Sequence, residues 1–273
     1  MLDARVNEAL ARVASGWRGP EDRWRFAVAV WKQLGGVHWV DRIERFAMRS
    51  PEVEKLPQYR WRSIFAGAPL RARRVNFVFG VGRTIRLADS LVGSDKLGHF
   101  FSQGLKYYRS GLDGWSEERI AGRGRFNERW LFGQLTTSVY SNADLVANWE
   151  GYLFYRSLFE GDVVSGKGPI VGFEHGEATI ARRFSWRDHV NDYWDEALHP
   201  SHWSPRLERA LRPKLEALCA ELVAAGAPLA PRGGPALASR YAHLGLRSEP
   251  ENRLEHLCAT GDAQVSGAPT LRR

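Results

Sequence analysis

Residues 94–104 read Ser-Asp-Lys-Leu-Gly-His-Phe-Phe-Ser-Gln-Gly, and this stretch decides how the rest of the chain is interpreted. Residues four apart lie on one face of a helix, so a helix here places Asp95, His99 and Gln103 in one polar line. The neighbouring face is apolar and can be buried by a core; it consists of Leu97, Phe100, Phe101 and Leu105. Asp95 and His99 are then either a metal-ligand pair or a carboxylate that orients a general-base histidine. The alternative is a capping aspartate beside a histidine of structural role.

Two later stretches repeat this pairing of a polar line with an apolar one. In a helix predicted over 142–158, Asp144, Asn148 and Tyr152 recur every four residues. Another line of that helix holds only small residues, which allows a close approach to a partner helix: Ala143, Ala147 and Gly151. In a helix predicted over 186–198 and the residue after it, three carboxylates and a histidine share one face: Asp188, Asp192, Asp195 and His199. Helix caps and solvated faces are the alternative interpretation of both stretches.

If the three polar lines converge, they form a pocket that suits Zn²⁺, Mn²⁺, Fe²⁺ or Ca²⁺ and a hydrolytic water. The predicted metal ligands are Asp95, His99, Asp144, Asp192 and Asp195. Of these, Asp95, His99 and Asp144 are also predicted to be catalytic. The predicted substrate contacts are Gln103, Asn148, Tyr152 and His175. His175 lies in a glycine-rich loop predicted over 161–178, which could close over the site. Without a metal, Asp95 and Asp144 could serve as general acid and base, as in polysaccharide cleavage.

The segment Asp95-Lys96-Leu97-Gly98-His99-Phe100 resembles the DKxxHF motif of VanZ-like proteins and of some bacterial envelope proteins, with Asp95 and His99 at the motif positions. The resemblance is confined to this segment, and it implies a role in the bacterial envelope. VanZ-like proteins span membranes. This chain contains no apolar run of the roughly 18 residues that a membrane span needs, so no transmembrane helix is predicted.

Hydrophobic periodicity predicts a mainly α fold, namely a single-domain helical bundle with one small β-hairpin. The domain is expected over 20–225, after an N-terminal helix and linker over 1–19. A tail rich in Pro, Gly and Arg over 226–273 is expected to be partly disordered, with residues beyond about 245 dispensable. The hairpin is expected to pair Val75–Phe79 with Arg83–Leu87.

Three local expectations complete the predicted fold. Residues 111–124 are rich in glycine and charge and are expected to form a loop, followed by a helix over 126–139. Trp24 and Trp31 lie seven residues apart on the apolar face of a helix over 20–34, so both are expected to be buried.

The composition indicates which kinds of partner and which cellular compartment are expected. A net charge of +8 and a pI near 9.8 favour a polyanionic partner or a membrane surface, although a GC-rich genome, which encodes arginine often, gives the same composition. No nucleic-acid-binding motif is present. Cys219 and Cys258 form neither a CxxC pair nor a disulfide framework, and Cys219 is expected to be a small core residue. The N-terminus has no secretory signal pattern, which predicts a cytoplasmic protein, with export by another route as the alternative.

Two functional hypotheses follow from these patterns. The first is a metal-assisted or carboxylate-based hydrolase that acts on a bacterial envelope, glycan or phosphorylated substrate. The second is a non-enzymatic α-helical binding protein whose basic surface meets a polyanion or a membrane surface. They differ in geometry, because a hydrolase requires the carboxylates of Asp95 and Asp144 to converge, whereas a binding protein does not.

Overall fold

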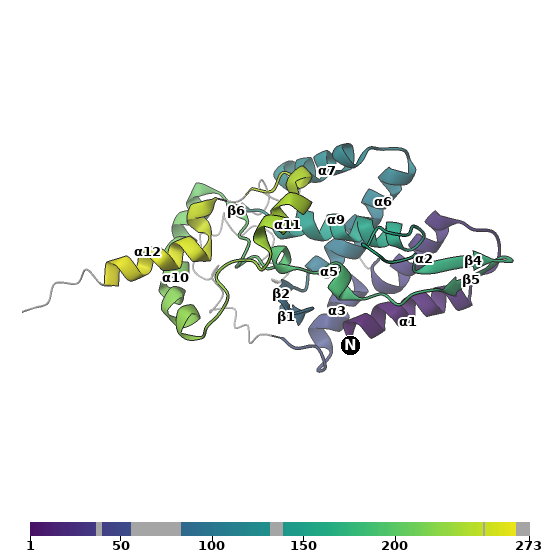
Figure 1. The fold of residues 1–273 in the computed structure, drawn as a ribbon, viewed down its shortest axis with the longest axis horizontal. Coiled ribbons are helices and arrows are strands. Elements are labelled where there is room, and N and C mark those ends of the chain that lie inside the picture. The colour runs from purple at the N-terminus through teal and green to yellow at the C-terminus, as the bar shows by residue number, and fades with distance from the viewer. Residues whose placement is uncertain (37–39, 56–82, 132–138, 248, 266–273) are drawn as a thin grey trace, which may run out of the picture.

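The computed structural model describes residues 1–36, 40–55, 83–131, 139–247 and 249–265 (Figure 1). The fold is mainly helical, as predicted. The α-helices are α1 (Leu2–Ser15), α2 (Arg23–Leu34), α3 (Arg42–Arg49), α5 (Lys96–Gly98), α6 (Gly104–Leu112), α7 (Glu117–Phe126), α9 (Asn142–Ser157), α10 (Pro205–Ala224), α11 (Gly234–Arg240) and α12 (Leu254–Val265). Two π-helical segments are η3 (His99–Gln103) and η4 (Asn127–Leu131), and the 3₁₀ segments are η5 (Trp186–Asp188), η6 (Asp192–Trp194), η7 (Ala242–Leu244) and η8 (Pro250–Asn252).

Small antiparallel sheets join these helices. The strands are β1 (Thr84–Leu87), β2 (Ser90–Gly93), β3 (Val139–Tyr140), β4 (Val171–Glu174), β5 (Glu177–Ile180) and β6 (His202–Trp203). Within the described ranges they pair as β1–β2, β3–β6 and β4–β5, in place of the single hairpin that the sequence predicts. The predicted strand Arg83–Leu87 is largely confirmed, but its described partner is the segment that follows it, which was expected to be a linker. The other predicted strand, Val75–Phe79, lies outside the described residues.

The centre of the molecule is the crossing of α9 over the helix that runs through α5, η3 and α6 (Figure 1). A Cβ atom added to Gly151 would lie 1.9 Å from the backbone oxygen of Phe100, and one added to Gly104 would lie 2.6 Å from the backbone of Gly151. No side chain fits at that separation, so these glycines allow the two backbones to touch. The small-residue line predicted for the 142–158 helix is therefore used at Gly151 as expected. Because of this crossing, α9 packs against α5 and η3, the segments that follow Asp95.

Aromatic rings fill the space around this crossing. Phe100 packs with its ring centroid 4.9 Å from that of Trp186 and 5.3 Å from that of Phe154. All three side chains are buried, and tilted or edge-on arrangements of this kind are favourable for aromatic pairs. The predicted apolar face of the 94–104 stretch is thus part of the main core.

Trp24 and Trp31 are only half-buried, so the prediction that both are buried is wrong. The buried face of α2 consists instead of Phe26, Ala27, Val30 and Leu34. The Arg109 guanidinium covers the Trp24 ring at 5.0 Å, and the Trp31 indole N–H donates to Ser102 Oγ over 2.9 Å. Both tryptophans therefore lie at the edge of the core, with one part against apolar groups and another against polar groups.

The helix predicted over 186–198 does not form. The chain there makes two short 3₁₀ turns, η5 and η6, because polar side chains at their starts bond locally. Ser185 Oγ accepts from the Arg187 amide, and Asn191 Oδ1 accepts from the Tyr193 amide. Such local bonds favour turns over a continuous helix.

Two predicted loops contain regular structure. The stretch 111–124 was expected to be a loop, but most of it belongs to α7, which begins after a Ser116 cap and buries Ile120, Ala121 and Gly124. The predicted loop 161–178 contains β4 and the start of β5. The segment 126–139 was predicted to be one helix. It is π-helical up to Leu131, and Val139 belongs to the strand β3; the residues between them lie outside the described residues.

The C-terminal residues form a second small core at one end of the molecule, where α10 and α12 lie side by side (Figure 1). Leu254, Leu257 and Cys258 of the expected tail are buried against α10. A disulfide joins Cys258 to Cys219, a pairing that was not predicted from the sequence. The burial of Cys219 is as predicted. Much of the described part of 226–265 is therefore packed structure, which argues against the prediction that residues beyond about 245 are dispensable.

We expect the disulfide to stabilise the packing of α12. It closes a 39-residue separation, for which the loss of chain entropy in the unfolded state corresponds to about 2–4 kcal/mol. Cys258→Ser should lower the free energy of unfolding by that amount, measured by denaturation with and without reductant. Reductant should have the same effect on the wild type and none on the variant. Equal stability of the two proteins under both conditions would contradict this role.

The helix crossing gives a sharper test. Gly151→Ala should destabilise the protein by about 1–3 kcal/mol or more, because the added methyl group meets backbone that cannot move aside. Gly168→Ala is the matched control, since nothing lies within 4 Å of a Cβ atom added there. Thermal unfolding of both variants measures the difference. A Gly151 variant as stable as the Gly168 variant would show that the crossing is looser than described.

Candidate metal centre

Asp95, His99 and Asp144 form a group that could hold a metal ion. One ligand atom of each lies within 4.8 Å of the others. Asp95 precedes α5, His99 begins η3, and Asp144 lies in the first turn of α9. Their side chains are 45%, 28% and 15% exposed, so the group is open to solvent on the Asp95 side. The structure thus brings together the three residues that the sequence predicts to be both ligands and catalytic groups.

The His99 ring is oriented by Asn148. His99 Nδ1 lies 3.0 Å from Asn148 Oδ1, and the amide group of Asn148 also hydrogen-bonds the hydroxyl of Tyr107. Because an amide oxygen can only accept, Nδ1 carries the proton and donates it to Asn148. The other ring nitrogen, Nε2, then faces Asp144 Oδ2 at 3.3 Å. Asn148 therefore positions the His99 ring, and its contact with a substrate stays a prediction.

Lys96 is the centre of the surrounding charge, although the sequence analysis assigned it no role. Its side chain is 4% exposed, and Nζ lies 2.5 Å from Asp144 Oδ1, 2.9 Å from Asp95 Oδ2 and 3.5 Å from Glu196 Oε1. Burial alone would lower the pKa of Lys96, but the surrounding carboxylates outweigh it and hold the pKa well above its usual value. Lys96 thus remains charged and offsets the charge of one carboxylate oxygen of Asp95 and one of Asp144. In the sequence Lys96 lies between Asp95 and Leu97, and no spacing pattern there indicates this role.

The two carboxyl groups beside Lys96 have opposite proton affinities. Burial would raise the pKa of Asp144, but His99 and Lys96 lower it below its usual value. Burial, followed by the charge of Asp144, raises the pKa of Glu128 to about 8. Glu128 Oε1 accepts the backbone N–H of Ser141, the N-cap of α9, over 3.0 Å. Near neutral pH the site therefore combines an ionised Asp144 with a protonated Glu128.

Two further acidic side chains, those of Asp41 and Glu44, lie next to Gly98 of the 95–100 segment. Burial raises the pKa of Glu44 to about 8 and also raises that of Asp41. Asp41 Oδ2 accepts the hydroxyl of Ser102 over 2.5 Å. A Cβ atom added to Gly98 would lie 1.8 Å from Glu44 Oε1, so a glycine is required between the positions of Asp95 and His99. Gly98 thus has a packing role at a variable position of the motif.

The two remaining predicted ligands have other partners. Asp192 accepts the Ser90 hydroxyl over 2.8 Å and both side-chain and backbone N–H groups of Arg232 at 2.6–2.8 Å. Asp195 accepts the Ala197 amide over 2.9 Å, and burial raises its pKa to about 6. Neither belongs to the Asp95 group. Asp192 and Asp195 were predicted to approach Asp95 because they would share one face of a helix. That helix does not form, so the basis of the prediction is lost.

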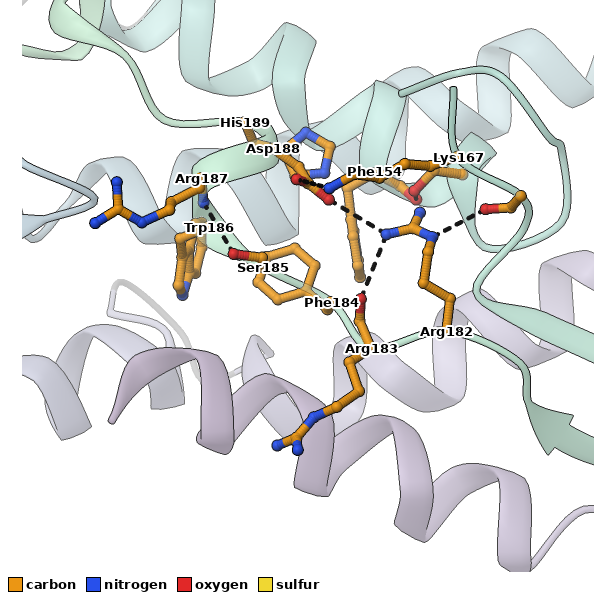
Figure 2. A network of polar contacts seen from close by, with 12 residues as sticks. Phe154, Lys167, Arg182, Arg183, Phe184, Ser185, Trp186, Arg187, Asp188 and His189 are labelled. Carbon is orange, nitrogen blue, oxygen red and sulfur yellow. Dashed lines mark hydrogen bonds and ion pairs between the residues drawn. The ribbon is translucent and has the colours of Figure 1, made fainter. Parts of the chain in front are cut away.

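Asp188, which was predicted to share the acidic helix face, forms ion pairs with two basic side chains. It accepts hydrogen bonds from Lys167 Nζ over 2.5 Å and from Arg182 Nη1 over 3.2 Å (Figure 2). These contacts attach η5 to the β4–β5 region. The neighbouring His189 is buried and lies 3.1 Å from Glu150, which also accepts two N–H groups of Arg240. This second buried ion cluster was not identified from the sequence and holds α11 against α9.

The other predicted substrate contacts are dispersed. Gln103 is half-buried at the end of η3, one turn beyond His99. Tyr152 is buried against Trp149, with ring centroids 4.9 Å apart. His175 is exposed in the turn between β4 and β5, and this hairpin lies at the end of the molecule opposite α10 and α12 (Figure 1). The structure gives His175 no place in the Asp95 group.

Comparison of the chain with protein-family models, curated proteins and solved structures found no match. In the part of the chain that the structure describes, no helix has the length and apolarity that crossing a membrane requires.

The raised pKa of Glu128 gives a pH-dependent prediction. Its folded-state pKa of about 8 exceeds the ordinary glutamate pKa of 4.5, so the folded state binds the proton more tightly. The resulting stabilisation is complete below about pH 4.5 and is lost as pH rises toward 8. Glu128→Gln, which keeps the acceptor for Ser141, should flatten the fall in melting temperature between pH 5 and 8. Glu216→Gln on the exposed side of α10 is the control. An unchanged slope in the Glu128 variant would show that this carboxyl is ionised at neutral pH.

Proposed function

We propose that Asp95, His99 and Asp144 bind a divalent transition-metal ion, and that the protein is a metal-dependent hydrolase of phosphorylated envelope substrates. The observation that carries the proposal is the 3.3 Å separation of His99 Nε2 and Asp144 Oδ2. With the Nδ1 proton directed at Asn148, Nε2 presents a lone pair to an anionic oxygen. That contact is repulsive unless a cation lies between the two atoms. A proton on Nε2 or a metal ion satisfies it, and the third ligand, Asp95, favours the metal.

The donor set narrows the choice of metal. One imidazole nitrogen and two carboxylates suit Zn²⁺, Mn²⁺ or Fe²⁺, whereas Ca²⁺ prefers oxygen ligands alone. Two ligands about 2.0–2.1 Å from a tetrahedral zinc ion lie about 3.3–3.4 Å apart, which fits the separation between His99 and Asp144. Three protein ligands leave at least one position for water, as in catalytic zinc sites. Zn²⁺ is therefore the first candidate.

The surrounding charges fit a hydrolytic role. A bound metal lowers the pKa of its water toward neutrality and so supplies hydroxide as a nucleophile. Lys96 offsets part of the negative charge of Asp95 and Asp144, which leaves the site able to accept an anionic substrate. The net charge of +8 favours a phosphorylated substrate over a neutral glycan. Glu128, protonated near neutral pH, offers a proton store beside the site.

The metal-free alternative has less support. A pair of carboxylates that acts as acid and base needs one member with a raised pKa. The pKa of Asp144 is lowered, and Lys96 contacts both Asp95 and Asp144. A bound metal ion requires ionised carboxylates, which is the state that this arrangement favours.

The cysteine pair bears on the compartment. Stable disulfides are typical of oxidising compartments, so the Cys219–Cys258 bond favours function outside the reducing cytoplasm. This proposal replaces the cytoplasmic expectation and agrees with an envelope substrate. Alkylation and mass spectrometry of protein from its native compartment would detect the bond. Free thiols there would contradict it.

Metal binding is the first test. The metal-free protein should bind one Zn²⁺ or Mn²⁺ per chain by titration calorimetry, and His99→Ala and Asp144→Asn should abolish this binding. Asn148→Ala should weaken it by about 10–100-fold, as expected for a residue that orients a ligand. His175→Ala, at an exposed histidine far from the site, is the matched control. Absence of stoichiometric binding in the wild type would overturn the metal centre.

Hydrolysis is tested separately with the metal-loaded protein. A panel of phosphomonoester and phosphodiester substrates should include at least one that is hydrolysed by the wild type and by His175→Ala, but not by His99→Ala. Metal binding with no turnover on phosphorylated or glycan substrates would leave a metal-binding protein and remove the hydrolase.

A further inference from the structure

The outer face of α7 and η4 combines exposed aromatic rings with arginines. Helical spacing places Arg119, Arg123, Phe126 and Trp130 on one side, and Arg129 lies beside Trp130. Phe126 is 56% exposed and Trp130 is 45% exposed, although both are large apolar side chains. We call these five residues the α7 stripe.

Packing explains why this face points outward. The opposite side of α7 buries Ile120, Ala121 and Gly124. A Cβ atom added to Gly124 would lie 2.0 Å from the hydroxyl of Tyr107 in α6 and 3.4 Å from Leu145 in α9. The helix is thus pressed onto α6 and α9 by its small residues, and α7 lies along the outer edge of the molecule (Figure 1).

The arginines of the stripe carry uncompensated positive charge. The two acidic residues at the start of α7 are used elsewhere, since Glu117 pairs with Arg156 at 2.6 Å and Glu118 pairs with Arg125 at 3.1 Å. No carboxylate among the described residues pairs with Arg119, Arg123 or Arg129. Their guanidiniums lie instead against indole rings: Arg119 and Arg123 at 3.9 Å and 5.3 Å from the Trp115 centroid, and Arg129 at 5.0 Å from that of Trp130.

We propose that the α7 stripe docks the protein on an anionic lipid surface, with Phe126 and Trp130 in the headgroup layer and Arg119, Arg123 and Arg129 on lipid phosphates. Tryptophan and phenylalanine beside arginine are the composition of helices that lie in a membrane interface. The stripe is carried on an outer helix, whereas stacking platforms for single-stranded nucleic acid lie in charged grooves. The geometry therefore fits a lipid surface better than a nucleic acid.

The stripe also has a defined relation to the candidate metal centre. Glu128, on the inner side of the same π-helical turn as Trp130, bonds the N-cap of the helix that carries Asp144. Docking through the stripe would therefore hold one wall of the site at the lipid surface. The docking proposal rests on the exposed residues alone and does not require the metal.

Vesicle co-sedimentation of the full chain tests the proposal. The wild type should bind vesicles with about 30% phosphatidylglycerol far better than pure phosphatidylcholine, and should release them as salt rises from about 0.1 M to 0.5 M. Arg119→Gln with Arg123→Gln should weaken binding roughly tenfold to thirtyfold, because each arginine contributes about fivefold near an anionic surface. Phe126→Ser with Trp130→Ser should weaken it at least tenfold by removing the inserted rings.

Matched control variants on α10 distinguish an effect of the α7 stripe from an effect of the overall charge or apolarity of the protein. Arg206→Gln with Arg209→Gln removes the same charge from another exposed helix, and Val223→Ser removes an apolar side chain that is 51% exposed. Both should bind vesicles like the wild type. Equal losses in the control and stripe variants, or no preference for anionic vesicles, would overturn the proposal. So would binding to a single-stranded oligonucleotide that the stripe variants lose while vesicle binding is absent.

Discussion

The close crossing of α9 over the helix that contains η3 is the constraint on which the rest of the structure depends. Gly151 and Gly104 let the two backbones touch, and no larger residue fits at either position. Because the crossing fixes the rotation of both helices, it also fixes which residues of their first turns face each other. His99 and Asp144 meet at 3.3 Å as a consequence. The aromatic core around Phe100 then encloses the crossing on its apolar side.

Charge balance is the second constraint on the same region. A buried lysine in contact with several carboxylates is stable only while those contacts persist, since an unpaired buried charge is costly. Lys96 therefore holds Asp95 and Asp144 near each other even without a metal. The same arrangement keeps Asp144 ionised, which is the state that a metal ligand requires. The site is thus prepared electrostatically by residues that would not themselves bind the ion.

The sequence predicted those parts of the site that depend on local spacing. Asp95 and His99 on one stretch, and Asp144 and Asn148 on another, follow from the four-residue period of a helix. The role of Lys96 depends on tertiary distance and could not be read from spacing. Asp192 was wrongly included because Ser185 and Asn191 favour local turns where a helix was predicted. In the fold, glycines in 111–124 were interpreted as loop residues, whereas Gly124 is used for close packing against α6.

Anomalous diffraction from crystals of the zinc-loaded protein would test whether a metal ion binds between His99 and Asp144, as we propose. We expect one anomalous peak about 2.0–2.2 Å from His99 Nε2 and from a carboxylate oxygen of both Asp95 and Asp144. The Nδ1 contact with Asn148 should persist. A zinc-free site in which His99 Nε2 donates a proton directly to Asp144, under saturating zinc, would contradict the account.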